Sequence, residues 1–142
     1  MKKDDIGYLI KLISDRMRTQ GDAELKQYDL TFSQVRILSY LHRYGPKATQ
    51  KEIEAWLDVA HPTVVGLVSR LEKNGFVECY PDPQDRRNKL VGLTPKSYEI
   101  KERVDEKKQQ NELQMAAGLL PEEQQELIHL LKRVYANLEQ ED

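Results

Sequence analysis

Three cations, Arg86, Arg87 and Lys89, lie within four consecutive residues of the segment PDPQDRRNK, which spans residues 81–89. Arginine and lysine side chains bind phosphates, and an arginine can enter the minor groove of DNA where a narrow A·T-rich tract concentrates negative potential. Asp85 precedes Arg87 by two residues, so its carboxylate can orient the guanidinium. We therefore expect Arg87 to enter a minor groove and the other two cations to meet phosphates. The predicted nucleic-acid contacts of this segment are Asp85, Arg86, Arg87, Asn88 and Lys89.

The runs on either side of this segment are prone to form β-strands. They are FVECY, at residues 76–80, and LVGL, at residues 90–93. The residues between them are too many for a two-residue turn. The sequence therefore predicts a β-hairpin with a long, charged tip. The alternative is a hairpin whose tip is only solvated and binds nothing.

The segment before the hairpin, residues 61–74, predicts a short amphipathic helix, and Pro62 suits its first turn because proline lacks an N–H group. The face opposite its apolar stripe carries small or basic side chains, which suit a helix pressed into a major groove about 12 Å wide. The stripe consists of Val64, Leu67, Val68 and Leu71, a pattern that an ordinary surface helix would also show. The side chains predicted to face DNA are His61, Pro62, Thr63, Val65, Gly66, Ser69, Arg70 and Lys73.

Two capping boxes predict where the preceding helices begin. In a capping box, a threonine hydroxyl accepts a hydrogen bond from the backbone N–H three residues later, while a Gln or Glu side chain at that position reaches back. Thr31 and Gln34 form one such pair, and Thr49 and Glu52 form the other. Because the two boxes are only eighteen residues apart, they imply short helices packed closely together.

These helices complete a helix-turn-helix. The helix that begins after Thr31 is predicted to end near Tyr44, with Gly45 as its left-handed stop. The next helix, over residues 50–57, leads through a tight turn into the helix of residues 61–74, which is the order of a helix-turn-helix. Two residues at the start of the middle helix are expected to contact the DNA backbone: Thr49 and Gln50.

Long helices with apolar stripes are predicted on both sides of residues 30–94. In the first helix, over residues 4–28, the stripe is Ile6, Leu9, Ile10, Ile13 and Met17. After Pro121 it is Leu127, Leu130, Leu131, Val134 and Leu138. Since a core near residues 30–94 leaves both stripes without a partner, we expect a homodimer that buries them and sets two DNA-reading helices roughly 34 Å apart. An intramolecular helical bundle is the alternative.

The charge of the chain is unevenly distributed. The 142 residues carry a net charge of −2, which is unusual for a protein that binds DNA. Residues 61–96, however, hold six Lys and Arg against four Asp and Glu, whereas residues 97–142 hold six against eleven. Acidic helices kept away from the phosphates would leave the local field positive at the predicted interface.

Several classes of protein are disfavoured. No apolar run approaches the roughly 18 residues of a membrane span, and the lone Cys79 cannot form an internal disulfide, so we expect a cytoplasmic protein with no membrane partner. His42, His61 and His129 lack the spacing of a metal site. The chain has no Gly-rich phosphate loop, nucleophile elbow or zinc-hydrolase motif. We therefore expect no metal, no cofactor and no enzymatic activity.

In order and spacing, four stretches resemble the multiple-antibiotic-resistance regulator (MarR) family of bacterial and archaeal transcription factors: LTFSQVRILSYL, TQKEIEAWL, PTVVGLVSRLEKNGFV and DPQDRRNKLVGLTPKS. With the long flanking helices, the resemblance covers essentially the whole chain. It implies a mainly α fold with a small β-hairpin wing (α+β), that is, a winged helix-turn-helix between dimerisation helices. The implied domains are an N-terminal dimerisation helix (residues 1–29), a winged DNA-binding domain (30–96) and C-terminal dimerisation helices (97–142).

The resemblance also implies a function, that of a homodimeric regulator that binds a pseudo-palindromic operator in double-stranded DNA and, as a repressor, is released by a small molecule. Asp85 and Arg87 match the wing pair of the family. Val65 and Gly66 depart from it, because many members have Ser or Thr at the first position and Arg at the second. The operator sequence therefore does not follow from the resemblance. A winged dimer used only for protein–protein contact is the alternative.

The effector implied by the resemblance is a small aromatic or anionic compound. Four residues are candidates to line its site, because aromatic and cationic side chains hold such an anion: Tyr8, Arg16, Tyr40 and His42. Cys79 lies on the first strand of the hairpin, whereas the peroxide sensors of the family carry their reactive cysteine in the first helix. We therefore expect Cys79 to be a packing residue and not a redox sensor.

Overall fold

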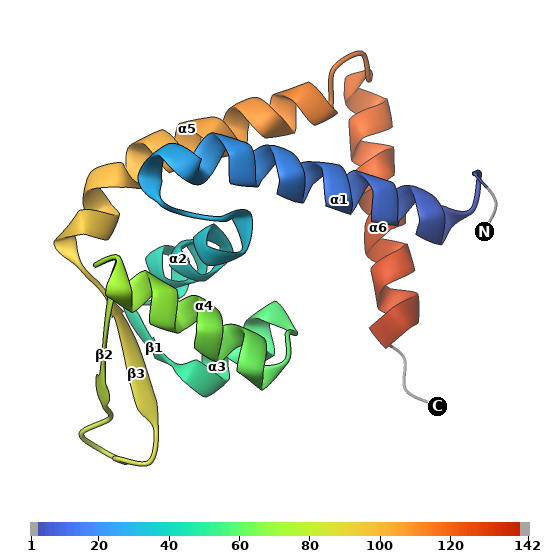
Figure 1. The fold of residues 1–142 in the computed structure, drawn as a ribbon. Coiled ribbons are helices and arrows are strands. Elements are labelled where there is room, and N and C mark those ends of the chain that lie inside the picture. Colours follow the sequence, from blue (N-terminus) through green and yellow to red (C-terminus); the bar gives the residue numbers. More distant parts are fainter. Residues whose placement is uncertain (1–2, 140–142) are drawn as a thin grey trace. The chain divides into compact units, whose positions relative to one another are not determined.

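Helices predominate in the computed structural model, which describes residues 3–139 (Figure 1). The elements are α1 (Ile6–Leu25), a 3₁₀ turn (Lys26–Tyr28), α2 (Phe32–Tyr44), β1 (Lys47–Thr49), α3 (Gln50–Leu57), α4 (His61–Lys73), β2 (Val77–Pro81), β3 (Lys89–Leu93), α5 (Pro95–Met115) and α6 (Pro121–Glu139). The predicted fold class, mainly α with a small β wing, is confirmed. The chain divides into two compact units within α5, between Glu102 and Arg103.

Both predicted capping boxes are formed. The Thr31 hydroxyl accepts from the Gln34 backbone N–H at 3.2 Å, and the Gln34 side-chain oxygen accepts from the Thr31 N–H at 2.9 Å. Thr49 and Glu52 repeat the exchange at 3.2 and 3.3 Å. The start of α2 receives a further carboxylate, because Asp22 of α1 accepts the Phe32 N–H at 2.7 Å. These bonds satisfy N–H groups that a helix start otherwise leaves unpaired.

The wing belongs to a three-stranded antiparallel sheet in the order β1-β3-β2. The hairpin of β2 and β3 was predicted, and Cys79 lies opposite Val91 in its register. The third strand, β1, was not predicted, because three residues show no alternation and its last residue, Thr49, already serves as a helix cap. Pairing of β1 with β3, Ala48 opposite Val91, joins the wing to the helix-turn-helix.

The core of the first unit forms around α4. Val64, Val68 and Leu71, three of the four residues of the predicted stripe, are completely buried. They are joined by other fully buried side chains from α2, α3, the end of the α4–β2 turn and β3: Ile37, Leu41, Ile53, Phe76 and Val91. One face of α4 is therefore fixed against the core, and its opposite face lies at the surface.

Two local predictions were wrong. Gly45 follows α2 but is not left-handed, since its φ is −92°. A glycine is needed there for a different reason: a Cβ would lie 2.5 Å from the Leu41 carbonyl oxygen and 2.6 Å from the Lys47 nitrogen. The first helix was predicted to reach residue 28, but α1 ends at Leu25 and a 3₁₀ turn follows, closed by Asp29 with φ 59°. A single residue in the left-handed region stops the helix.

The second unit holds the rest of α5 and α6. Gly118, with φ 84°, lies in the turn between them. The side chain of Glu123 accepts the Leu120 N–H at 2.8 Å, and Glu122 and Glu123 lie in the first turn of α6, where carboxylates favour the positive end of a helix. Within the described residues, α6 buries no side chain, and its apolar stripe is exposed except for the half-buried Val134.

The first capping box should contribute measurably to stability. We expect Thr31→Ala to lower the free energy of unfolding by about 1 kcal/mol, because the Gln34 N–H loses its acceptor. Thr31→Ser keeps a hydroxyl and should lose much less. Urea denaturation at one fixed protein concentration measures both variants, and equal losses would show that the hydroxyl is not what matters.

Candidate nucleic-acid interface

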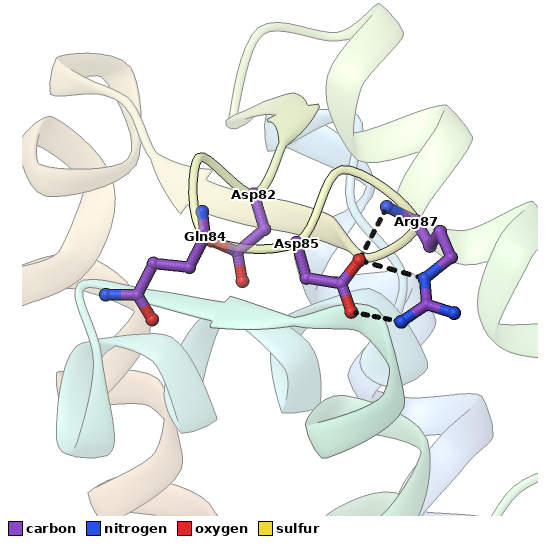
Figure 2. A network of polar contacts seen from close by, with 4 residues as sticks. All are labelled: Asp82, Gln84, Asp85 and Arg87. Atoms are coloured by element: carbon purple, nitrogen blue, oxygen red, sulfur yellow. Dashed lines mark hydrogen bonds and ion pairs between the residues drawn. The ribbon is translucent and has the colours of Figure 1, made fainter.

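The tip of the wing holds one cation in a fixed orientation (Figure 2). Asp85 accepts three hydrogen bonds from Arg87: Oδ1 accepts from the backbone N–H at 3.2 Å and from Nε at 3.0 Å, and Oδ2 accepts from Nη2 at 3.2 Å. The predicted contact between the two residues is therefore confirmed. The Arg87 side chain is 91% exposed, so its guanidinium is oriented and also available to a ligand.

Backbone bonds close the loop that carries this pair. The Asp82 N–H donates to the Asn88 carbonyl at 3.0 Å, and the Asn88 N–H donates to the Asp85 carbonyl at 2.9 Å. The Asp82 side chain accepts the Gln84 N–H at 2.9 Å. Because these bonds order the backbone of the tip, they fix where its cationic side chains leave the chain. Arg86 and the strand residue Lys89 are exposed.

The charge of Asp85 is maintained by its neighbours. The Arg87 side chain lowers the pKa of the Asp85 carboxyl, and the Arg87 backbone N–H lowers it further. Lys51, in the first turn of α3, adds a smaller lowering effect, so a second cation acts on the same carboxylate. Lys51 was not among the predicted contacts. Its effect on Asp85 depends on the pairing of β1 with β3, which brings the start of α3 to the wing.

The outward face of α4 matches the predicted set. His61, Pro62 and the other side chains expected to face DNA are all exposed, namely Thr63, Val65, Gly66, Ser69, Arg70 and Lys73. A Cβ added at Gly66 would meet nothing within 4 Å, so this glycine opens the surface and is not required by packing. The face thus offers the apolar side chain of Val65, two hydroxyls and two cations beside the open position at Gly66.

At the start of α3, the predicted residues are held by other side chains. The Thr49 hydroxyl, which caps α3, also donates to Glu52 Oε1 at 3.0 Å. Gln50 Nε2 donates to Glu54 Oε1 at 3.3 Å. The same Glu54 oxygen contacts His61 Nδ1 across the turn to α4. Glu54 was not predicted, because its contact with His61 lies between two helices and depends on how they meet across the turn.

The four effector candidates lie on two helices. Tyr8 and Arg16 lie on α1, where Tyr8 is half-buried and Arg16 is exposed. Tyr40 of α2 packs its ring against Trp56 of α3, with 5.0 Å between ring centroids. His42, two residues along α2, has other partners: its Nε2 lies 2.9 Å from Ser97 Oγ, and its ring makes a T-shaped contact with that of Tyr98, near the start of α5. These contacts point Tyr40 and His42 toward different elements.

Cys79 lies half-buried on β2, and its N–H donates to the Glu72 carboxylate at 2.9 Å. Loss of solvent raises the pKa of the Cys79 thiol to about 11, an effect that the nearby Glu72 reinforces and Lys89 opposes. A thiol in this state is protonated at neutral pH and reacts slowly. Among residues 3–139, no cluster of three or more His, Cys, Asp or Glu is arranged to hold a metal, and no helix is long and apolar enough to cross a membrane.

Comparison with known proteins decides the family. The model of the MarR family matches residues 28–88, which contain the capped helices and most of the wing. The uncharacterised HTH-type transcriptional regulator YwoH of Bacillus subtilis is 34% identical over 113 residues, which cover 80% of this chain and 81% of YwoH. This chain belongs to the MarR family. Members of the family are regulators of transcription and not enzymes.

Solved structures of MarR-family proteins share the fold along nearly the whole chain. The MepR–DNA complex of S. aureus superimposes with a TM-score of 0.89 at 28% identity, covering 96% of this chain and 100% of that one. A mutant MarR from E. coli complexed with operator DNA gives a TM-score of 0.83 at 27% identity, covering 91% of this chain and 92% of that one. The winged helix-turn-helix of this chain is thus that of a MarR-family transcriptional regulator.

The contact between Asp85 and Arg87 predicts how the Asp85 carboxyl titrates. Arg87→Ala should raise the pKa of Asp85 toward the ordinary value of about 3.9, because the largest cause of its lowering is removed. In the wild-type protein the carboxylate should stay charged as the pH falls below that value, so the pair breaks only as the pH passes the lowered pKa. Carboxyl ¹³C NMR measures the titration of Asp85 in the wild type and in the variant. Asp15, whose pKa Lys11 lowers, is the internal control, and an unchanged Asp85 titration would contradict the assignment.

Proposed function

We propose that this protein is a homodimeric, sequence-specific DNA-binding regulator of the cytoplasm that acts as a repressor released by a small-molecule effector. The observation that carries the proposal is that complete burial of one face of α4 leaves the opposite face exposed, in the same unit as a wing whose Arg87 is oriented by Asp85. A helix face reads the major groove, and an oriented arginine reads the shape of the minor groove.

In the proposed complex, α4 enters the major groove with its exposed face against the bases. Gly66 lets the helix backbone approach closely, since it has no side chain to hold the surfaces apart. Val65 supplies an apolar contact suited to a thymine methyl, and Arg70 and Lys73 near the end of the helix reach base edges or phosphates. The expected phosphate contacts at the edge of the groove are Thr49, Gln50, Arg86, Asn88 and Lys89.

Arg87 is the residue proposed to enter the minor groove beside each half-site. Its bond to Asp85 restricts the guanidinium before DNA arrives, which reduces the entropy lost on binding. Asp85 itself carries a negative charge, so its proposed role is to position Arg87 and not to contact phosphate.

The proposed homodimer rests on two exposed apolar faces. On α1, six large apolar side chains are exposed: Ile6, Leu9, Ile10, Leu12, Ile13 and Met17. On α6, Leu127, Ile128, Leu130, Leu131, Tyr135 and Leu138 are exposed. Contiguous apolar surface of this extent is uncommon on a monomer and marks an interaction site. A second copy of the chain supplies two such faces of matching chemistry, and a palindromic operator requires two-fold symmetry.

Thermodynamic linkage sets a condition on how an effector could release the protein from DNA. A small aromatic or anionic compound near Tyr8, Arg16, Tyr40 and His42 would favour a spacing of the two reading helices that does not fit the operator. The effector must then bind less tightly to the DNA complex than to the free protein, by the same factor by which it weakens DNA binding. Without that difference in affinity, the effector could not release the operator.

Operator binding tests the wing assignment. Arg87→Ala should weaken binding to the DNA upstream of the gene that encodes this protein by about 1–3 kcal/mol. Fluorescence anisotropy against that duplex and a scrambled one measures the loss. Arg133→Ala, which removes the same charge from α6, is the matched control and should bind like the wild type. Affinity that neither falls with rising salt nor differs between the two duplexes would reject DNA as the partner and favour protein–protein contact.

The assembly is tested by placing a charge in each apolar face. Ile13→Glu in α1 and Leu131→Glu in α6 should convert the dimer into monomers, because a carboxylate would be buried without a partner. Sedimentation velocity measures the mass in solution. The monomeric variants should also lose most of their operator affinity, since each offers only one reading helix. A wild-type protein that sediments as a monomer, or variants that remain dimeric, would refute the proposed interface.

A further inference from the structure

A single carboxylate oxygen joins the two helices of the helix-turn-helix at their proposed DNA-facing ends. Oε1 of Glu54 accepts a hydrogen bond from Gln50 Nε2 at 3.3 Å and also contacts His61 Nδ1. Gln50 begins α3, and His61 begins α4. Glu54 therefore holds two side chains that the proposed function places at the DNA, although it is not expected to touch DNA itself.

The environment of the pair favours an oriented histidine. The Glu54 side chain is 19% exposed, whereas that of His61 is 67% exposed, so the carboxylate lies at the protein side of the contact and the imidazole at the solvent side. The N-cap of α4, Ala60, offers no side-chain hydrogen bond. With Nδ1 engaged by Glu54, the other ring nitrogen, Nε2, is the one left to meet a ligand.

We propose that Glu54 is a positioning residue that holds His61 for contact with a DNA phosphate and makes operator binding take up a proton. This inference rests on the proposed function. In the complex, His61 is an imidazolium that donates from Nδ1 to Glu54 and from Nε2 to a phosphate oxygen. The proton comes from the buffered solvent: an N–H bond forms at Nε2, and the acid form of the buffer loses that proton.

The protonation state decides which contacts are possible. A neutral imidazole that donates from Nδ1 to Glu54 has a bare, accepting Nε2, which repels a phosphate oxygen. Protonation turns Nε2 into a donor and adds a positive charge between two anions. Histidine side chains in general change charge between about pH 5 and pH 8, so the change falls in the range where a protein works.

The other charged groups near His61 in the sequence do not change their charge in this pH range. Asp58, the left-handed C-cap of α3, is a second carboxylate three residues before His61. On α4 itself the first turn carries no acidic residue, and the basic ones, Arg70 and Lys73, lie in its last turn. Phosphates, Asp, Glu, Lys and Arg keep their charge between about pH 6 and pH 8. A change of charge at this site between those pH values therefore requires a change at the imidazole.

The direction of the pH effect follows from linkage. If the complex holds the proton more tightly than the free protein, DNA affinity rises as the pH falls. A proton held tenfold more tightly in the complex strengthens the limiting DNA affinity by about tenfold. Affinity should therefore increase from about pH 8 to about pH 6, in the range where histidine titrates.

The experiment measures operator affinity by anisotropy across this pH range at constant ionic strength, for the full-length protein and four variants. His61→Gln should bind with little change between the pH extremes. Glu54→Gln keeps an oxygen that accepts hydrogen bonds but loses the charge, so its pH dependence should be much weaker than that of the wild type. Glu54→Ala loses the oxygen as well and should bind more weakly than Glu54→Gln at high pH. His129→Gln, on α6, should keep the wild-type profile.

A second measurement counts the proton directly. Calorimetric titration of the operator near pH 7, in buffers with different heats of ionisation, should show proton uptake by the wild type and by His129→Gln, but much less by His61→Gln. Selective binding with the same pH profile in wild type and His61→Gln would overturn this inference and leave the proposed function standing. Failure of every form to bind DNA selectively would overturn both. Circular dichroism serves as the check that each variant is folded.

Discussion

Complete burial of one face of α4 is the constraint on which the rest of the structure depends. Val64, Val68 and Leu71 have no exposed surface, and α4 packs against α2, α3 and β2. Turning the helix about its axis would expose these side chains, at a cost of about 1.5–3 kcal/mol for each. The helix therefore has one orientation, and the residues on its outer face are presented as a set.

Strand pairing places the wing in the same way. A two-stranded hairpin alone is marginally stable in water. Pairing of β3 with β1 adds a third strand, and β1 leads directly into α3 through Thr49, which both ends the strand and caps the helix. The wing tip is therefore held in register with the start of α3. This is why Lys51 of α3 acts on Asp85 at the tip.

Sequence patterns predicted the parts of the fold that local chemistry determines. Capping boxes at Thr31 and Thr49 marked two helix starts correctly, because the hydrogen bonds form within four residues. The spacing of Asp85 and Arg87 likewise predicted their contact. The strand β1 was missed, since its only signal is a partner more than forty residues away. The contact of Glu54 with His61 was missed for a different reason, because it depends on how two helices meet.

The two ends of α4 are attached to different parts of the unit, which bears on how an effector could act. The N-terminal end is held within the helix-turn-helix by Glu54. At the other end, the carbonyl of Asn74 accepts from Lys96 of α5 at 2.6 Å, and the Asn74 side chain donates to the Asp29 carbonyl, beside the end of α1, at 3.4 Å. If α4 moves as a rigid body, displacement of α1 or α5 would be passed to it through these bonds. A small shift there would tilt α4 about the end that Glu54 holds, and its outer face would leave the position that the proposed contact with the major groove requires.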